Sequence, residues 1–472
     1  MDFYRLLFQQ GNHIQEEIRI MKPTPDAQKH YLFTNKALTA LILPLIIEQL
    51  LAVLVGMADT IMIASVGESA VSGVSLVDSV MLLLINAFQA LATGGAVVAG
   101  QYLGTKNRKK ACESSTQLVW FVTILAVIVM AVMYLGKNFI LHVVFGQIEA
   151  DVMYHANIYL LIVTASIPFI ALYNAGAAVF RSMGNSKVSM QVSLLMNAIN
   201  VAGNAILIYG FHRGAEGVAI PTLVSRMVAG ILITVLLLNQ NLTLHIKPSF
   251  HYRFNKIMVK KILQIGIPNG LENSMFQLGK IIVLSLVSTF GTYAIAANAV
   301  GNVFASFQVL PGMAINLGIT TVISQCVGAH DYDQAHYYTK KLLKITYVLT
   351  FLTVVIMMAS SSLIVQAYNL SDITAAEAVK IFFLHSVSAA IIWPIAFSVP
   401  ASLRAAGDVQ YCMIVSIASM WICRIVFSYI LGRFMGLGLF GVWGAMILDW
   451  WVRAAFFTVR YRKGTWKTKA LV

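Results

Sequence analysis

The chain alternates between long apolar stretches and short polar ones. Most of the apolar stretches reach the length of about 20 residues that a helix needs to cross a bilayer. They predict twelve spanning helices over residues 37–63, 74–98, 116–136, 152–180, 188–210, 218–240, 259–289, 294–325, 342–366, 374–402, 410–431 and 437–458. The polar connections are too short for a soluble domain. The sequence therefore predicts an all-α polytopic membrane protein.

The second half of the chain repeats the first. Pro44 and Glu48 recur as Pro268 and Glu272, at a separation of 224 residues. The same separation relates the pairs Gly67 and Gly291, Ala70 and Ala294, Gln101 and Gln325, Gly104 and Gly328, and Ala111 and Ala335. Further on, "FRSMGN" with Arg181 matches "LRAAGD" with Arg404. Because each copy contains six spans, both copies start on the same side of the membrane. We therefore expect two six-helix lobes related by an axis along the membrane normal.

Five segments follow from the spans and the repeat. They are a cytoplasmic N-terminal arm (1–36), an N-lobe (37–240), a basic cytoplasmic linker (241–258), a C-lobe (259–458) and a basic cytoplasmic tail (459–472). The N-terminus lacks the apolar core and cleavage site of a signal peptide. An amphipathic helix on the inner membrane face and a disordered arm both remain open for it.

Composition and charge agree with a membrane protein. The 472 residues are 58% hydrophobic and 11% charged, whereas soluble domains are about a quarter charged. Most of the basic residues lie in segments on one side of the predicted spans, such as "KNRKK" at 106–110. The net charge of +14 is therefore explained by topology, and no nucleic-acid partner is needed. We expect the protein to lie in the cytoplasmic (inner) membrane with both termini on the cytoplasmic side.

Motifs for other kinds of chemistry are not found. The four cysteines form no CxxC motif or Cys/His cluster, so neither a zinc site nor a disulfide framework is indicated. The sequence has no GxxxxGK[ST] phosphate loop, nucleophile elbow or HExxH motif. We expect no enzyme activity, no metal and no cofactor beyond a coupling ion.

Two acids lie in the first apolar span, where ionisation costs at least ~2.5–3.5 kcal/mol. Glu48 and Asp59 are eleven residues apart, which places them on one helix face about 16 Å apart. Each can be an interfacial acid that caps a neighbouring helix, or a cavity carboxylate that exchanges H⁺ or Na⁺. We favour the second interpretation for Asp59, and less strongly for Glu48.

Polar residues on other spans are secondary candidates. Asn197, Asn200 and Asn204 share one stripe of span five, where they can bond a neighbouring helix or line a cavity. Asp78, Asn86 and Gln89 on span two are expected to line the first lobe. The second lobe offers Glu272, Gln277, Lys280, Asn298, Asn302 and Asp449. A salt-bridge network, with Glu272 and Lys280 neutralising each other or pairing with Asp449 and Arg453, is weighed equally with a functional role.

Several stretches together resemble the multidrug and toxic compound extrusion (MATE) family of secondary transporters. They include "MADTIMIASVGESAVSGVSL", "GQYLGTKNRKKA", "FRSMGNSKVSM", "GTYAIAANAV", "SQCVGAHDYDQA" and "LRAAGDVQYCM", and the likeness covers essentially all of 37–458. The resemblance implies two six-helix bundles around a V-shaped cleft, and exchange of organic, often cationic compounds for H⁺ or Na⁺. Many members carry an acid fifteen residues after a proline of span one, the spacing of Pro44 and Asp59.

The chain departs from that pattern at two places. Some members pair an Asn with an Asp four residues later on span five, where this chain has Asn200 and Asn204. Some sodium-coupled members have an acid later on span seven, where this chain has Phe276 and Gln277, and an Asp on span ten, which this chain lacks. The resemblance thus implies coupling through Asp59 and leaves the ion open.

The expected function is that of an antiporter that exports cationic or amphipathic small molecules in exchange for H⁺ or Na⁺, acting as a monomer in the lipid bilayer. One alternative is a flippase of lipid-linked glycans or other amphiphiles, which would require a basic cavity and often has fourteen helices. An intramembrane enzyme would require a convergent catalytic set that the sequence lacks. A channel would differ by flux that neither saturates nor runs uphill.

Overall fold

The computed structural model describes residues 31–146, 148–247 and 253–472. Most of the predicted N-terminal arm therefore lies outside the described residues. Residues 35–472 form one compact unit, and residues 31–34 belong to a second unit, in which they form a short bend. The described residues contain helices and no strands.

The first half of this unit contains these helices: α2 (Asn35–Ala64), α3 (Glu68–Gly104), α4 (Arg108–Leu135), α5 (Lys137–Phe139), η1 (Ile140–Val144), α6 (Ala150–Thr164), α7 (Ile167–Ser182), α8 (Ser186–Ala205), η2 (Ile206–Gly210) and α9 (Glu216–Leu237). The second half contains α10 (Lys256–Ser288), α11 (Thr292–Gly328), α12 (Tyr332–Ala359), α13 (Ser361–Ala367), α14 (Asp372–Ile391), α15 (Trp393–Ala405), α16 (Val409–Ser419), η3 (Met420–Val426), η4 (Ser428–Phe434), α17 (Gly438–Arg462) and η5 (Thr465–Thr468). Segments η1 to η4 are π-helical, and η5 is a 3₁₀-helix.

All twelve predicted spans lie on helices. In the described part of the chain, ten helices are long and apolar enough to cross a membrane, and α6 with α7 makes an eleventh, bent by 49°. The twelfth, α10, is more polar because Asn269, Glu272 and Asn273 interrupt its middle. Several helices start earlier than the apolar pattern predicts: α3 begins at Glu68 and α4 at Arg108, since polar residues extend a helix beyond the bilayer.

The repeat is visible in the details of helix ends. The side chain of Asn107 accepts a hydrogen bond from the Lys110 backbone N–H at the start of α4, and that of Asp331 accepts one from Gln334 at the start of α12. Gly67 (φ 139°) and Gly291 (φ 107°) precede α3 and α11 with backbone angles that favour glycine. Repeated residues therefore have the same local role in each half.

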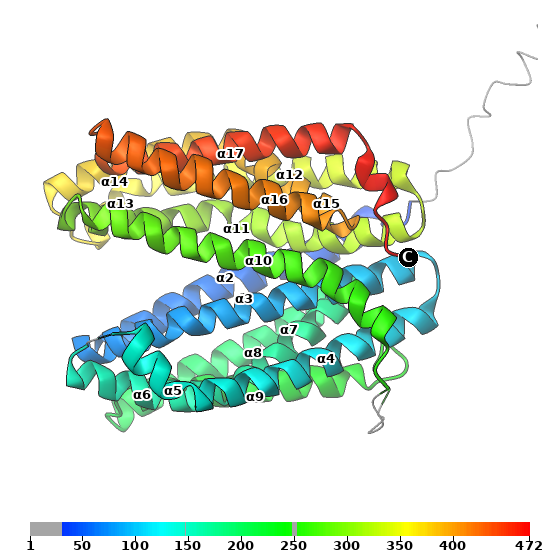
Figure 1. Cartoon of the computed structure of the whole chain (residues 1–472), viewed down its shortest axis with the longest axis horizontal. Helices are drawn as coiled ribbons and strands as arrows, with labels where there is room; N and C mark the ends of the chain where they lie inside the picture. Colours follow the sequence, from blue (N-terminus) through cyan, green and yellow to red (C-terminus); the bar gives the residue numbers. More distant parts are fainter. Residues whose placement is uncertain (1–30, 147, 248–252) are drawn as a thin grey trace, which may run out of the picture. The chain divides into compact units, whose positions relative to one another are not determined.

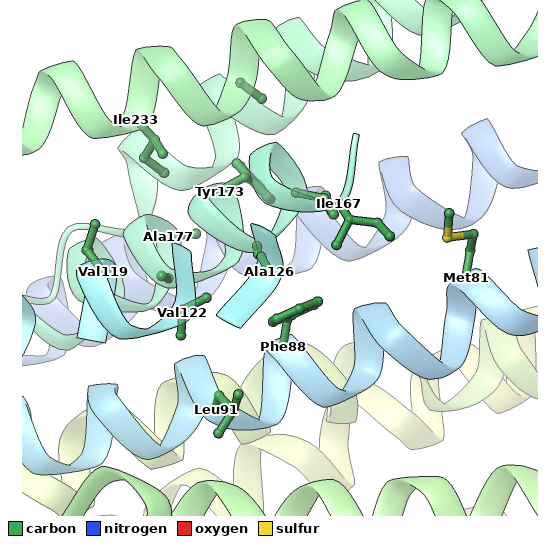
Figure 2. Close-up of a cluster of buried hydrophobic side chains, with 14 of the residues drawn as sticks. Met81, Phe88, Leu91, Val119, Val122, Ala126, Ile167, Tyr173, Ala177 and Ile233 are labelled. Carbon is green, nitrogen blue, oxygen red and sulfur yellow. The ribbon is translucent and has the colours of Figure 1, made fainter. Parts of the chain in front are cut away.

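Helices α2–α9 and α10–α17 form two lobes with separate apolar cores, and Figure 1 shows the two groups. The N-lobe core includes Met81, Phe88 and Leu91 of α3, which pack with side chains of α4, α7 and α9 (Figure 2). The C-lobe core gathers side chains from α10, α11, α12, α14, α15 and α17. The first half of α10 is shared, because Met258, Ile262 and Ile265 pack into the N-lobe core.

The lobes meet where α3 and α11 end. A Cβ on Gly104 would collide with the Gln325 carbonyl oxygen, and one on Gly328 would collide with the Gln101 carbonyl oxygen. The side chains of the two glutamines also form hydrogen bonds from one lobe to the other. Gln101 Nε2 donates to the Ala405 carbonyl oxygen at 3.1 Å, and Gln325 Nε2 donates to the Ser182 carbonyl oxygen at 2.7 Å. These reciprocal contacts form a junction, made of Gln101, Gly104, Gln325 and Gly328, at the end of the helices that we predict to be cytoplasmic.

Gly328→Ala is expected to destabilise the protein by about 1–3 kcal/mol, because its Cβ has no room beside the Gln101 backbone. Thermal unfolding of the purified protein in detergent measures the effect. Gly270→Ala is the matched control, since its added Cβ would lie 3.7 Å from Ala90 Cβ, an ordinary contact. Equal stability of Gly328→Ala and the control would show that the lobes do not rest in this close contact.

Candidate functional site

The N-lobe contains a cavity of about 520 Å³ lined by side chains of α2, α3, α6, α7, α8 and α9. Its polar lining includes Asp59, Asp78, Asn197, Asn200 and Arg226. Asp59 lies five residues before the end of α2 at Ala64, which is about 8 Å along the helix axis. Two carboxylates and one guanidinium thus share a polar hollow in the membrane-spanning part of the lobe.

Asp59 contacts two amides of α8. Asn204 Nδ2 donates to Asp59 Oδ1 at 2.7 Å, whereas Asn204 Oδ1 is buried with no partner among the described residues. Asn200 lies between Asp59 and Thr222. When its Nδ2 faces Asp59, it donates to the two carboxylate oxygens at 2.9 and 3.3 Å and accepts from Thr222 Oγ1 at 3.1 Å. In the opposite orientation, Nδ2 donates to Thr222 Oγ1 at 3.1 Å and Oδ1 faces Asp59.

Asp78 and Arg226 complete the polar lining. Asp78 Oδ1 accepts from the Tyr159 hydroxyl at 2.9 Å, and Arg226 Nη1 donates to Ser166 Oγ at 3.0 Å. Arg226 also attracts both cavity carboxylates over a longer distance. Sequence reasoning missed Arg226 and Tyr159. An arginine inside a membrane span was the available signal, because such a charge usually faces a cavity or a partner.

Glu48 lies outside this cavity and is buried. It accepts from Arg181 Nη1 at 3.3 Å, from the Tyr173 hydroxyl at 3.2 Å and from Ser189 Oγ at 2.9 Å. Ser189 belongs to α8, as does the Asn204 that bonds Asp59, so both acids of α2 point toward α8. Because its oxygens are engaged by Arg181 and two hydroxyls, Glu48 has the partners of a structural group.

The predicted partners of Glu272 were wrong. Glu272 pairs with Arg404 at 2.5 Å, not with Lys280, Asp449 or Arg453. Asp449 instead accepts from Arg453 Nε at 2.8 Å within α17. Glu272–Arg404 is the repeat equivalent of Glu48–Arg181, so each lobe has the same buried ion pair. The repeat in the sequence matched both members of each pair, so it showed that the two pairs are equivalent, but it did not show that their members meet.

The other polar candidates lie apart from the cavity. Asn86 and Gln89 of α3 are half-buried and are not among the residues that line the cavity. Asn298 Oδ1 accepts from Trp443 Nε1 at 3.1 Å, and Asn302 Nδ2 donates to the Asn298 carbonyl oxygen at 2.9 Å. Gln277 is half-buried on α10. Within the described ranges, no group of three or more His, Cys, Asp or Glu side chains could hold a metal ion.

The architecture defines a class of protein. Two repeated lobes of membrane-spanning helices with ionisable residues between those helices are typical of secondary transporters. The MatE family model matches both halves of the chain, at residues 44–206 and 268–430, so the chain belongs to the MatE family. It is a membrane transport protein and not an enzyme.

Relatives and solved structures agree with this membership. The chain is 28% identical over 447 residues to "Uncharacterized transporter YisQ" of Bacillus subtilis strain 168, covering 92% of this chain and 96% of that protein. It is 25% identical to "Probable multidrug resistance protein NorM" of Thermotoga maritima, covering 93% and 94%. A structure titled as the outward-facing conformation of a multidrug resistance MATE family transporter matches with a TM-score of 0.86 at 20% identity, covering 92% and 96%. That last likeness concerns the fold.

Proposed function

We propose that the chain is a secondary active antiporter that exports cationic or amphipathic small molecules in exchange for H⁺ or Na⁺. The observation that carries the proposal is Asp59, a carboxylate in a cavity of the membrane-spanning region whose neighbours can adjust to its charge. A charged ligand that neutralises Asp59 changes the relative energy of two states only if it binds them unequally. Exchange follows when ion and substrate favour opposite states.

Asn200 supports a role for Asp59 in binding a cation. An ionised Asp59 accepts from Asn200 Nδ2, while a protonated Asp59 can donate to Asn200 Oδ1, and Thr222 satisfies the remaining amide atom in both cases. The buried Asn204 Oδ1 is a further oxygen that can accept a hydrogen bond from a protonated Asp59 or join a Na⁺ shell. The amides of α8 can therefore serve Asp59 in its free and its occupied form.

The proposal includes a location and an arrangement in the membrane. We place the protein in the cytoplasmic (inner) membrane with both termini inside, and assign residues 37–240 and 259–458 to the lobes that alternate around the substrate. The linker 241–258 and the tail 459–472 would lie on the cytoplasmic side. Because one chain supplies both lobes, it is expected to work as a monomer without nucleic acid or cofactor.

Separate ion gradients test the proposal. Purified protein in proteoliposomes is given a pH gradient or a sodium gradient, and movement of ethidium, a cationic dye, is followed by fluorescence. One of the gradients should drive ethidium uphill, with a rate that saturates as ethidium increases. If neither gradient moves ethidium or any of a panel of cationic dyes, the antiporter proposal is wrong, and uphill saturable flux would exclude a channel.

A flippase of lipid-linked glycans or other amphiphiles is the second candidate. The described helices provide at most eleven spans by length and composition, twelve with α10, and so do not supply the fourteen that would favour it. The observation in its favour is a group of cations in the C-lobe, described next. An assay with a fluorescent lipid-linked sugar, without any imposed ion gradient, would separate the two candidates.

A further inference from the structure

Three cations of the C-lobe surround one aromatic ring. Lys280 Nζ lies 5.1 Å from the ring centroid of Phe276, Arg424 Cζ lies 5.2 Å from it, and Arg453 Cζ lies 5.7 Å from it. The three come from α10, η3 and α17, which pack together in the lobe. We call Phe276, Lys280, Arg424 and Arg453 the cation cluster.

One carboxylate accompanies these three positive charges. Asp449 is bonded to Arg453, whose Nη2 also donates to the Ser416 carbonyl oxygen at 3.0 Å. Asp449 attracts Arg424 as well, but Arg424 and Lys280 make no ion pair within 4.0 Å among the described residues. The cluster therefore has two positive charges in excess of its acid.

Arg424 has an unused donor. Its side chain is only 9% exposed, and its Nε is buried with no hydrogen-bond partner in the described part of the structure. A buried donor without a partner is unfavourable, and more so when it is charged. Arg424 also lies in the π-helical segment η3, a distortion that is frequent at functional sites. An anionic ligand would satisfy this donor and offset the repulsion between Arg424 and Lys280.

Lys280 is placed to receive such a ligand. Its side chain is exposed although it lies well inside α10, eight residues before the helix end at Ser288. Long side chains on a helix lean toward its N-terminus and lie over the preceding turn. This direction brings Lys280 Nζ over Phe276, one turn back toward the middle of α10. Its charge therefore stays with the cluster.

The cation cluster and the acidic cavity of the N-lobe lie at similar depth. Helices α3 and α10 cross at Leu91 and Gly266, where a Cβ on Gly266 would lie 3.1 Å from Leu91 Cα. Asp78 precedes Leu91 by thirteen residues and Lys280 follows Gly266 by fourteen, so both lie about 20 Å along their helices from this crossing. Both lie toward the predicted outer side, since α3 runs inward and α10 runs outward.

We propose that Lys280 and Arg424 bind an anionic group, a carboxylate or a phosphate, of the exported amphiphile, which is therefore zwitterionic. The inference rests on the proposed export function and names its substrate class. The cation of the substrate faces the N-lobe, where two acids exceed one arginine, and its anion faces the C-lobe.

Two dyes that differ at one group test the inference. Rhodamine B carries a cationic ring system and a carboxylate, and its methyl ester keeps the cation and loses the anion. Their Kd values are measured by fluorescence anisotropy with the full chain in phosphatidylcholine nanodiscs, without an ion gradient. Wild-type protein should bind the zwitterion more tightly than the ester by about tenfold.

Lys280→Met and Arg424→Gln should each weaken rhodamine B binding by about tenfold and change ester binding less than about twofold. Lys260→Met, an exposed lysine of the same helix, is the matched control and should change neither Kd. Equal affinity of the wild type for both dyes, no binding of either dye, or equal losses for both dyes in the variants would overturn the inference. Binding is measured without a gradient, so failure of ion coupling alone would leave this result standing.

A lipid headgroup is the other source of the same chemistry. Repeating the rhodamine B titration in nanodiscs with added phosphatidylglycerol distinguishes it from a transported anion. Unchanged affinity supports a site for the transported amphiphile. Affinity that falls in wild type but not in Lys280→Met would assign the cluster to lipid phosphate and overturn the inference for the substrate.

Discussion

Asp59→Asn is expected to reduce gradient-driven dye efflux to the level of protein-free liposomes while the protein still inserts and folds. The amide keeps the size of the side chain and can still contact Asn204 and Asn200, but it cannot take up a proton or neutralise Na⁺. An ion then cannot bias the two states of the transporter. The effect of the ion on dye affinity, about 5- to 150-fold for typical coupled sites, should vanish.

The measurement pairs gradient-driven efflux with dye binding at two pH values and two sodium concentrations. Asp372→Asn is the control, because Asp372 is an exposed acid in the first turn of α14 and lies outside the cavity. Efflux by Asp59→Asn at the wild-type rate would reject Asp59 as the coupling residue. Loss of folded protein in Asp59→Asn, judged by size-exclusion chromatography, would show that Asp59 is a structural acid.

Arg404→Met is expected to cost about 3–5 kcal/mol of stability, because it leaves Glu272 buried without its ion partner. The carboxylate of Glu272 is 9% exposed, and its Oε2 has no hydrogen-bond partner among the described residues. The double variant Glu272→Gln/Arg404→Met removes both charges and should regain most of the loss. Thermal unfolding of the three proteins in detergent measures the difference.

The repeat provides a matched pair for this experiment. In the N-lobe, Arg181→Met should likewise be less stable than the double variant Glu48→Gln/Arg181→Met. The loss of stability in Arg181→Met should be smaller than in Arg404→Met, because Tyr173 and Ser189 also donate hydrogen bonds to Glu48. A double variant in the C-lobe that is stable but inactive would contradict a structural role for Glu272. It would place Glu272 in the coupling mechanism.

Much of the architecture was predictable because it depends on local composition. The apolar stretches determined the spans, since a bilayer accepts backbone only when its hydrogen bonds are made within a helix. The even number of spans per repeat determined parallel lobes. Pro44, Glu48, Gly67 and Gln101 each have an equivalent in the other half, and the MatE model matches each half in turn.

The candidate site was predictable in part. Asp59, Asn200 and Asn204 were expected as neighbours, and the structure brings them together between α2 and α8. Asn86 and Gln89 were expected to line the first lobe, and they are not among the residues that line this cavity. Helical periodicity places a residue on a face of its own helix, but the rotation of that helix against its neighbours is decided by packing in the lobe.

The sequence by itself determined that this is a helical membrane protein and where its spans lie, because both depend on residues close together in the chain. It also determined that the two halves repeat, because the same residues recur at a constant separation. Only the tertiary structure decided which charges meet. Glu272 finds Arg404 rather than Lys280, Arg226 joins the two cavity acids, and Lys280 gathers with Arg424 around Phe276. The Coulomb energy of two charges depends on the distance between them, and for side chains of different helices that distance is set by how the helices pack.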